Sequence, residues 1–249
     1  MAERAVRDEL LARGQELFDA PKKGLVKFTD VPRANKLLNN LRDYPHAFVL
    51  ACLMDRQIKA ERAWLIPYLL SEKLNGFSMD SLVRLTEART QILMSTPQPL
   101  HRFSTKMGRL FHLCVKRIVG EYNGDAARIW RGKPSSAAVV YRFLQFDGIG
   151  LKIATMATNI LARDFKVPLS DYYSIDVSAD VHVRRVFTRL GLCQPSVPVE
   201  QIIYKARSLH PEFPGLLDLP SFEIGRKWCR PQKPLCGECY MQQICPSAV

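Results

Sequence analysis

The chain has 249 residues, of which 47% are hydrophobic and 24% are charged. This composition supports a folded core and excludes a disordered basic tail. Thirty-six lysines and arginines against 24 acidic residues give a formal charge of +12, which indicates an anionic partner, most simply nucleic acid. The apolar runs are too short to cross a bilayer, and the first residues lack the apolar core of a signal peptide. We therefore expect a cytoplasmic protein without membrane contact.

Apolar residues recur at helical spacing along almost the whole chain, which predicts an all-α fold. The first amphipathic helix carries Val6, Leu10 and Phe18 and breaks near Pro21. The next helix, 47–54, is apolar on nearly every face, so we expect it in the core. Further helices are predicted over residues 60–74, 78–94, 103–122, 136–146, 151–165, 181–190 and 199–209.

A glycine-rich turn joins two of these predicted helices. It contains Gly148, Ile149 and Gly150 in the order Gly-Ile-Gly. Two glycines allow a tight turn whose backbone amides face outward at the start of the next helix. Such amides can bind a phosphate of DNA or RNA, although the same pattern also serves as a simple turn between helices.

Lys152 follows on the first turn of the next helix. If its side chain were partly buried there, the positive end of the helix would favour the neutral amine. A neutral amine can attack a sugar carbon and form a Schiff base. The plainer alternative is a solvated lysine or one that contacts a phosphate.

Asp180 stands immediately before an apolar helical run, in the order Asp-Val-His. This position is typical of a helix N-cap. A capping carboxylate can also stabilise positive charge that develops on a deoxyribose. We expect His182 to be structural, and Asp176 is a second choice for the catalytic carboxylate.

The last thirty residues hold four of the seven cysteines: Cys229, Cys236, Cys239 and Cys245. Four thiols on so short a segment indicate a shared centre, either one zinc ion or an iron-sulfur cluster. The uneven spacing of six, two and five intervening residues favours iron-sulfur, because zinc ligands usually come in two short pairs. The other three cysteines lie singly among apolar neighbours and are expected to be ordinary small core residues.

The order of these features resembles the helix-hairpin-helix DNA glycosylases of the endonuclease III superfamily, over roughly residues 44–245. The resemblance implies two helical domains that flank a DNA-binding cleft. One is a six-helix barrel with the hairpin, over residues 40–165. The other is a helical iron-sulfur cluster domain, built from residues 1–39 and 166–249.

The resemblance also implies roles for individual residues. The four cysteines would bind a 4Fe-4S cluster, Gly148, Ile149 and Gly150 would hold the DNA backbone, Asp180 would be catalytic, and Lys152 would mark a member that also cleaves the sugar. Gln57 is similar to the glutamine that fills the gap left by an extruded nucleotide. We expect the basic residues of the cysteine loop to contact DNA; these are Arg226, Lys227, Arg230 and Lys233.

The sequence therefore predicts a monomeric base-excision glycosylase with associated lyase activity. It would act on double-stranded DNA with a damaged or modified base, and in a eukaryote it would lie in the nucleus. Two departures leave the base open: Phe146 and Asp147 replace the usual Leu-Pro, and residues 166–179 form a longer segment than in endonuclease III. The alternatives are a monofunctional glycosylase, a non-catalytic DNA-binding module and a zinc-stabilised scaffold.

Overall fold

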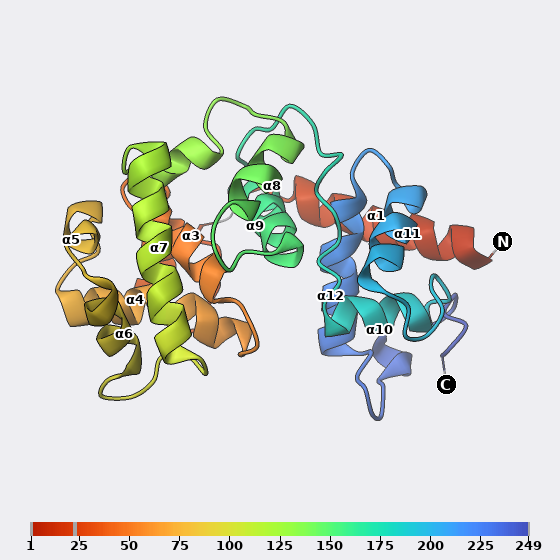
Figure 1. Ribbon diagram of the computed structural model, residues 1–249. Coiled ribbons are helices and arrows are strands. Elements are labelled where there is room, and N and C mark those ends of the chain that lie inside the picture. The colour runs from red at the N-terminus through yellow and green to blue at the C-terminus, as the bar shows by residue number, and fades with distance from the viewer. Residues whose placement is uncertain (1, 22–23, 249) are drawn as a thin grey trace. The chain divides into compact units, whose positions relative to one another are not determined.

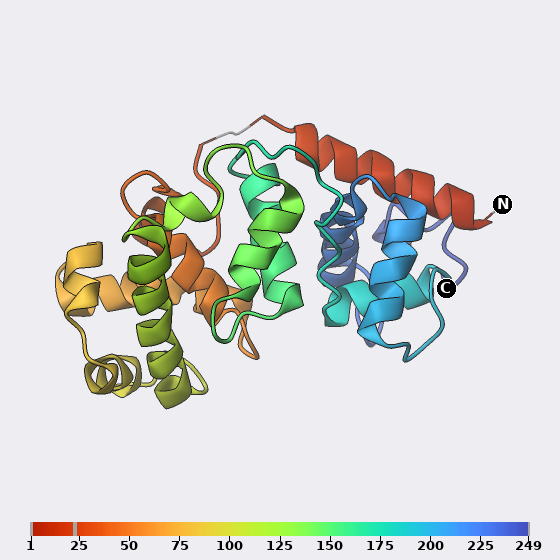
Figure 2. The same cartoon turned by 45° about the horizontal axis from the view of Figure 1, so that its top comes forward.

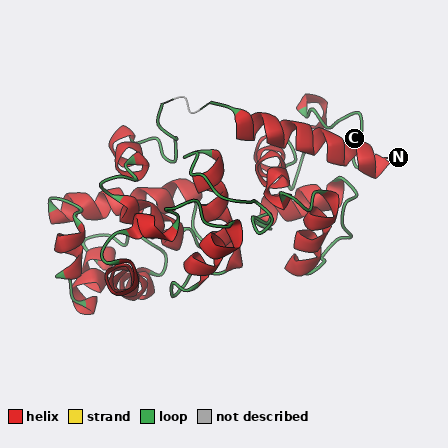
Figure 3. Ribbon diagram, turned by 90° about the horizontal axis from the view of Figure 1, so that it is seen from above, coloured by secondary structure: helices red, strands yellow, loops and turns green. Residues whose placement is uncertain are grey.

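The structure is a computed structural model that describes residues 2–21 and 24–248. Every regular element within these residues is helical (Figure 3), which confirms the predicted all-α class. The α-helices are α1 (Ala2–Asp19), α2 (Pro32–Asn39), α3 (Pro45–Met54), α4 (Ala60–Leu74), α5 (Met79–Val83), α6 (Glu87–Ser95), α7 (Ser104–Tyr122), α8 (Ser136–Leu144), α9 (Leu151–Arg163), α10 (Val181–Arg189), α11 (Val199–Leu209) and α12 (Asp218–Lys227). Short 3-10 turns are η1 (Ala126–Ile129), η2 (Pro214–Leu217) and η3 (Cys236–Glu238).

The chain forms two compact units. The terminal unit comprises Met1–Pro21, Ser135–Val140 and Thr158–Val249, and the central unit comprises Lys22–Pro134 and Tyr141–Ala157. The boundary between them passes through α8 and α9. The predicted domains, 40–165 and 1–39 with 166–249, stay a prediction, and their residues 1, 22–23 and 249 lie outside the described part of the chain.

The central unit is built around α3. All ten residues of this helix are buried, and α2, α4 and α7 pack around it; Figure 1 shows α3 beside α7. Phe48 of α3 lies 5.8 Å from Trp64 and 6.1 Å from Trp130 between ring centroids. This confirms the predicted core helix, which begins two residues earlier than expected because Pro45 suits a first helical turn.

The predicted helix over residues 78–94 is wrong as a single element. The chain forms α5 and α6 instead, because Thr86 leaves the helical conformation and its hydroxyl accepts the Arg89 amide at 3.2 Å. A threonine cap of this kind begins a new helix. The apolar spacing of the two short helices hides the break in the sequence.

The terminal unit packs α1 against α12, and α12 against α10. Figure 2 shows α1 lying across the other helices of this unit. Leu10 of α1 joins Phe187 of α10 and Ile224 of α12 in its buried core, and Arg13 of α1 pairs with Glu223 of α12 at 3.1 Å. The two ends of the chain thus share one core, which positions Asp180 and the cysteine loop.

Candidate functional site

The glycine turn forms a hairpin between α8 and α9. Phe146 and Ile149 point into the core with 1% and 6% of their surface exposed, and the Ile149 amide donates to the Phe146 carbonyl at 2.9 Å. Phe146 also stacks on Tyr122 of α7, with ring centroids 6.0 Å apart. Phe146, at the position where the resemblance implies a leucine, therefore anchors the hairpin to α7.

Gly148 needs to be glycine for two reasons. Its φ of +88° lies in the left-handed region, and a Cβ there would lie 2.7 Å from Leu110 of α7 and 3.2 Å from Leu53 of α3. Gly150 has no atom within 4 Å of the corresponding position. The first glycine closes the turn onto α3 and α7, and the second keeps its outer side open.

The open side of the hairpin carries the first amides of α9. Ile153 and Ala154 both donate to the Gly150 carbonyl at 3.0 Å, so the amides of Gly150, Leu151 and Lys152 precede the first bond within the helix. Amides in this position have no acceptor inside the helix and bind anions well. The Ile149 amide already donates to the Phe146 carbonyl within the turn. Ile149 therefore supports the open amides only through the packing of its side chain.

Lys152 lies on the first turn of α9 and its side chain is exposed. The burial that would favour a neutral amine is therefore absent within its own unit. Its charge is available to solvent or to an anion bound at the hairpin.

Asp180 is the N-cap of α10, as its place in the sequence predicted. Its Oδ1 accepts the amides of His182 and Val183, both at 2.8 Å. Among the described residues, its Oδ2 has no protein hydrogen-bond partner. The carboxylate is thus half-buried and fixed through Oδ1, while Oδ2 remains available to interact with a bound molecule.

The second choice, Asp176, is committed to another role. Only 2% of its side chain is exposed, and it forms a two-pronged ion pair with Arg207 at 2.7 and 2.8 Å. This pairing raises the pKa of Arg207. Asp176 therefore stabilises the terminal unit and leaves Asp180 as the available carboxylate.

Two arginines of α10 attach this helix to the cysteine loop. Arg185 donates to the carbonyls of Gly225 at 2.8 Å and Cys229 at 2.6 Å, and its guanidinium lies 3.0 Å from Nδ1 of His182. Arg189 donates to the Arg230 carbonyl at 2.6 Å. The helix that Asp180 caps and the cysteine loop therefore form one connected structure, and His182 joins it through its contact with Arg185.

The four cysteines of the tail line one small cavity of about 30 Å³ in the terminal unit, together with apolar residues such as Ile224 and Trp228. In the described part of the chain, no three of them lie close enough to hold a single metal ion. Burial raises the pKa of the Cys239 and Cys245 thiols, and the neighbouring cysteines raise it further. A positively charged centre in the cavity would favour the thiolates, so the donor set fits a metal or metal cluster.

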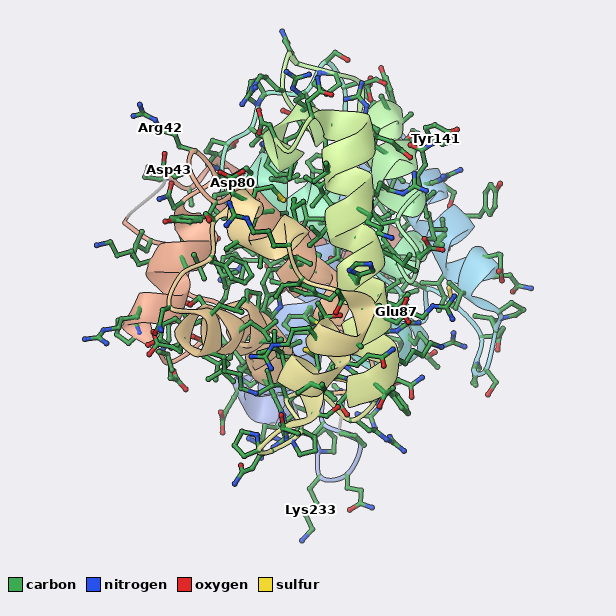
Figure 4. All side chains as sticks on the ribbon, turned by 60° about the vertical axis from the view of Figure 1, so that its left-hand side comes forward. Arg42, Asp43, Asp80, Glu87, Tyr141 and Lys233 are labelled. Atoms are coloured by element: carbon green, nitrogen blue, oxygen red, sulfur yellow. The ribbon has the colours of Figure 1, made fainter. Side chains whose placement is uncertain are left out.

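The basic residues of the loop differ in their surroundings. Lys227 pairs with Glu223 at 2.6 Å, and the Arg226 guanidinium lies over the Phe222 ring at 5.6 Å. Lys233 has a φ of +49° and points away from the tip of the loop (Figure 4). Arg230 and Lys233 are both exposed, so they are the two most open to a polyanion.

Gln57 follows α3 on an exposed turn and has a φ of +56°. The next residue back, Arg56, places Nη1 3.2 Å from the Cβ position of Gly148. The Gln57 turn and the hairpin are therefore neighbours within the central unit. The Gln57 side chain is exposed next to this hairpin.

The sequence alone did not single out three basic residues on or near the elements that hold the hairpin. Arg56 lies against the hairpin, and Lys106 and Arg109 of α7 are exposed on the helix that supports it. Their spacing of three residues puts both basic groups on one side of α7. That spacing was visible in the sequence, but the contact between α7 and the hairpin was not.

No helix in the described residues is long and apolar enough to span a membrane.

No family model matches the sequence, but individual proteins do. The chain is 31% identical to endonuclease III of Thermotoga maritima over 102 residues, which cover 41% of this chain and 43% of that protein. It is 30% identical to endonuclease III of Synechocystis over 138 residues, which cover 53% of this chain and 52% of that protein. The chain thus spans about half the length of the curated relatives it matches.

Solved structures match over nearly the whole chain. An endonuclease III trapped as a covalent intermediate with DNA has a TM-score of 0.65 at 17% identity, covering 98% of this chain and 96% of that one. A thermostable thymine-DNA glycosylase has a TM-score of 0.63 at 14% identity, covering 99% and 98%. The fold is therefore the helical endonuclease III fold. The sequence matches to two endonucleases III agree with the resemblance described in the sequence analysis.

Proposed function

We propose that this chain is a base-excision DNA glycosylase that removes a damaged or modified base from duplex DNA. The observation that carries the proposal is the geometry of Asp180, whose Oδ1 is fixed by two amides of α10 while Oδ2 stays open. A rigid carboxylate is suited to stabilising the positive charge that develops on a sugar as its base leaves. The likeness to endonuclease III supports the same reaction class.

Double-stranded DNA is the proposed partner. The open amides of Gly150, Leu151 and Lys152 would bind a backbone phosphate, and Arg230 and Lys233 would contact the backbone from the cysteine loop. An enzyme that acts on a base must extrude it from the stack, at a cost of a few kcal/mol that is smaller for a damaged base. Gln57 would fill the vacated space. We propose that the protein acts as a monomer on cellular DNA, in the nucleus if the cell is eukaryotic.

Lys152 is the proposed nucleophile. Its neutral Nζ would attack C1′ as the glycosidic bond breaks with its electron pair on the base, which takes up the amine proton. The C1′–O4′ bond would then break with its electron pair on O4′, which is protonated, and the resulting Schiff base would permit strand cleavage by β-elimination. The exposure of Lys152 within its own unit favours one alternative, a monofunctional glycosylase in which water attacks C1′ and Lys152 only binds phosphate.

Borohydride trapping distinguishes these two reactions. Borohydride should capture a covalent protein-DNA adduct with the wild-type protein on a suitable lesion, and the adduct should vanish in Lys152→Gln. Lys36→Gln is the matched control, because Lys36 is an exposed lysine of α2 in the same unit. Equal adduct yields in wild type and Lys152→Gln would assign the nucleophile elsewhere; base release with no adduct in either would identify a monofunctional enzyme.

We propose a 4Fe-4S cluster as the centre held by Cys229, Cys236, Cys239 and Cys245. Four thiols around one cavity, with an uneven spacing of six, two and five intervening residues, suit a cluster better than one zinc ion. When bound, the cluster would supply structural support for the loop. Arg185 and Arg189 would connect the ordered loop to α10 through their hydrogen bonds to its carbonyls.

Iron content and colour test the cluster. The purified protein should be brown and hold about four iron atoms per chain, and Cys239→Ser should lose most of both. Cys193→Ser should keep them, because Cys193 is a partly buried cysteine outside the cavity. A colourless protein with one zinc per chain would contradict the proposed cluster.

A further inference from the structure

Asp218 is a buried carboxylate that the proposed reaction does not yet use. It is the first residue of α12 and only 9% of its surface is exposed. Its Oδ1 accepts the backbone amide of Ser178 at 2.6 Å. This bond joins α12 to a segment 40 residues earlier in the chain, the one that leads into Asp180.

The contact continues directly to Asp180. The Ser178 carbonyl accepts the Asp180 amide, so Ser178 is held at its N–H by Asp218 and holds Asp180 through its C=O. The Ala179 amide donates to the Val177 carbonyl at 3.0 Å. The whole turn from Val177 to Asp180 is thus fixed by its backbone, with Asp218 as its side-chain support.

A carboxylate is costly at this place. Burial raises the pKa of Asp218 to about 6, while the Ser178 N–H and the positive charge of Arg163 lower it and Asp180 raises it. The hydroxyl of Ser221, one turn further along α12, is also buried without a hydrogen-bond partner in the described residues. A residue that served only packing would be apolar, because burying an ionisable group destabilises the fold.

We propose that Asp218 is a positioning residue for the reaction of Asp180: its buried carboxylate holds the Ser178 amide and so fixes the backbone from which Asp180 reaches the substrate. The assignment rests on the proposed glycosylase function. The catalytic group stays Asp180, and Asp218 acts only through the turn. Because a shift of about 1 Å in a reacting group can cost roughly 100-fold in rate, loosening this turn should slow base removal without weakening DNA binding.

Three substitutions separate position from charge. Asp218→Asn keeps an acceptor oxygen for the Ser178 amide and removes the charge. Asp218→Glu keeps the charge but moves the oxygen, and Asp218→Ala removes both. Ser221→Ala is the control, because it alters a buried polar group one turn further along α12 without touching Ser178.

Single-turnover base release and DNA affinity provide the first readout. We expect Asp218→Asn and Ser221→Ala within about threefold of the wild-type rate, and Asp218→Ala at least about tenfold slower. Asp218→Glu should be slower than Asp218→Asn, and all four variants should bind DNA within about twofold of wild type. Equal rates for Asp218→Ala and wild type, or a faster rate for Asp218→Glu than for Asp218→Asn, would overturn the proposal.

Amide hydrogen exchange provides a readout that does not depend on activity. The His182 and Val183 amides, which Asp180 caps, should exchange faster in Asp218→Ala than in wild type, and the Leu190 amide at the other end of α10 should not change. Unchanged exchange at His182 and Val183 would overturn the positioning role. If Asp218→Ala does not fold, Asp218→Glu against Asp218→Asn decides in both assays. If the wild type releases no base, the proposed function fails while the exchange data still test Asp218.

Discussion

Replacing Asp180 with asparagine is expected to slow base release by roughly 10²–10³-fold, the usual effect of removing one group that stabilises transition-state charge. The fold should survive, because asparagine caps a helix about as well as aspartate. Its side-chain oxygen can still accept the His182 and Val183 amides. We therefore expect the free energy of unfolding to change by no more than about 0.5 kcal/mol, while the carboxylate charge is lost.

Asp180→Ala is the matched variant for the capping role. It should lose about 1 kcal/mol of stability, the typical value of an N-cap, together with the same loss of rate. Urea unfolding and single-turnover kinetics on both variants separate the two roles of one side chain. Base release by Asp180→Asn at the wild-type rate would reduce Asp180 to a helix cap.

Replacing Gly148 with alanine is expected to destabilise the chain by about 2–4 kcal/mol, combining a left-handed backbone with overpacking. The added Cβ would lie 2.7 Å from Leu110, so the hairpin would have to move away from α7. DNA affinity should fall as well, because the open amides of Gly150, Leu151 and Lys152 move with the turn.

Gly150→Ala is the control for the hairpin. Its Cβ would enter open space, so the free energy of unfolding should stay within about 1 kcal/mol of wild type. Chemical denaturation and DNA titration of both variants measure the difference. An equally small loss of stability in Gly148→Ala and Gly150→Ala would show that the hairpin does not depend on its close packing against α7.

Local signals in the sequence predicted most of the helices. The predicted ranges 60–74 and 199–209 coincide with α4 and α11, because regular apolar spacing and breaking residues marked both ends. The chain gave no comparable signal for α2 or α12. Pro220 lies inside α12, and this helix forms because α1 and α10 pack on it, a tertiary effect that local propensity does not contain.

The candidate site divides in the same way. The glycine turn and the cap at Asp180 were predictable, since each depends on a few neighbouring residues. Asp218 was not, because its partner lies 40 residues away and an aspartate among leucines carries no local pattern. The exposure of Lys152 likewise depends on how α9 packs, which its sequence position could not reveal.

Detection of free base tests the central proposal most directly. The wild-type protein, in excess, would be incubated with a panel of duplexes that each carry one lesion: an oxidised pyrimidine, 8-oxoguanine or a deaminated base in a mismatch. Chromatography with mass spectrometry would then measure the released base. The proposed function predicts free base from at least one duplex, with an abasic site or a nick left in the strand. Tight binding to these duplexes without release of any base would contradict it and identify a DNA-binding module.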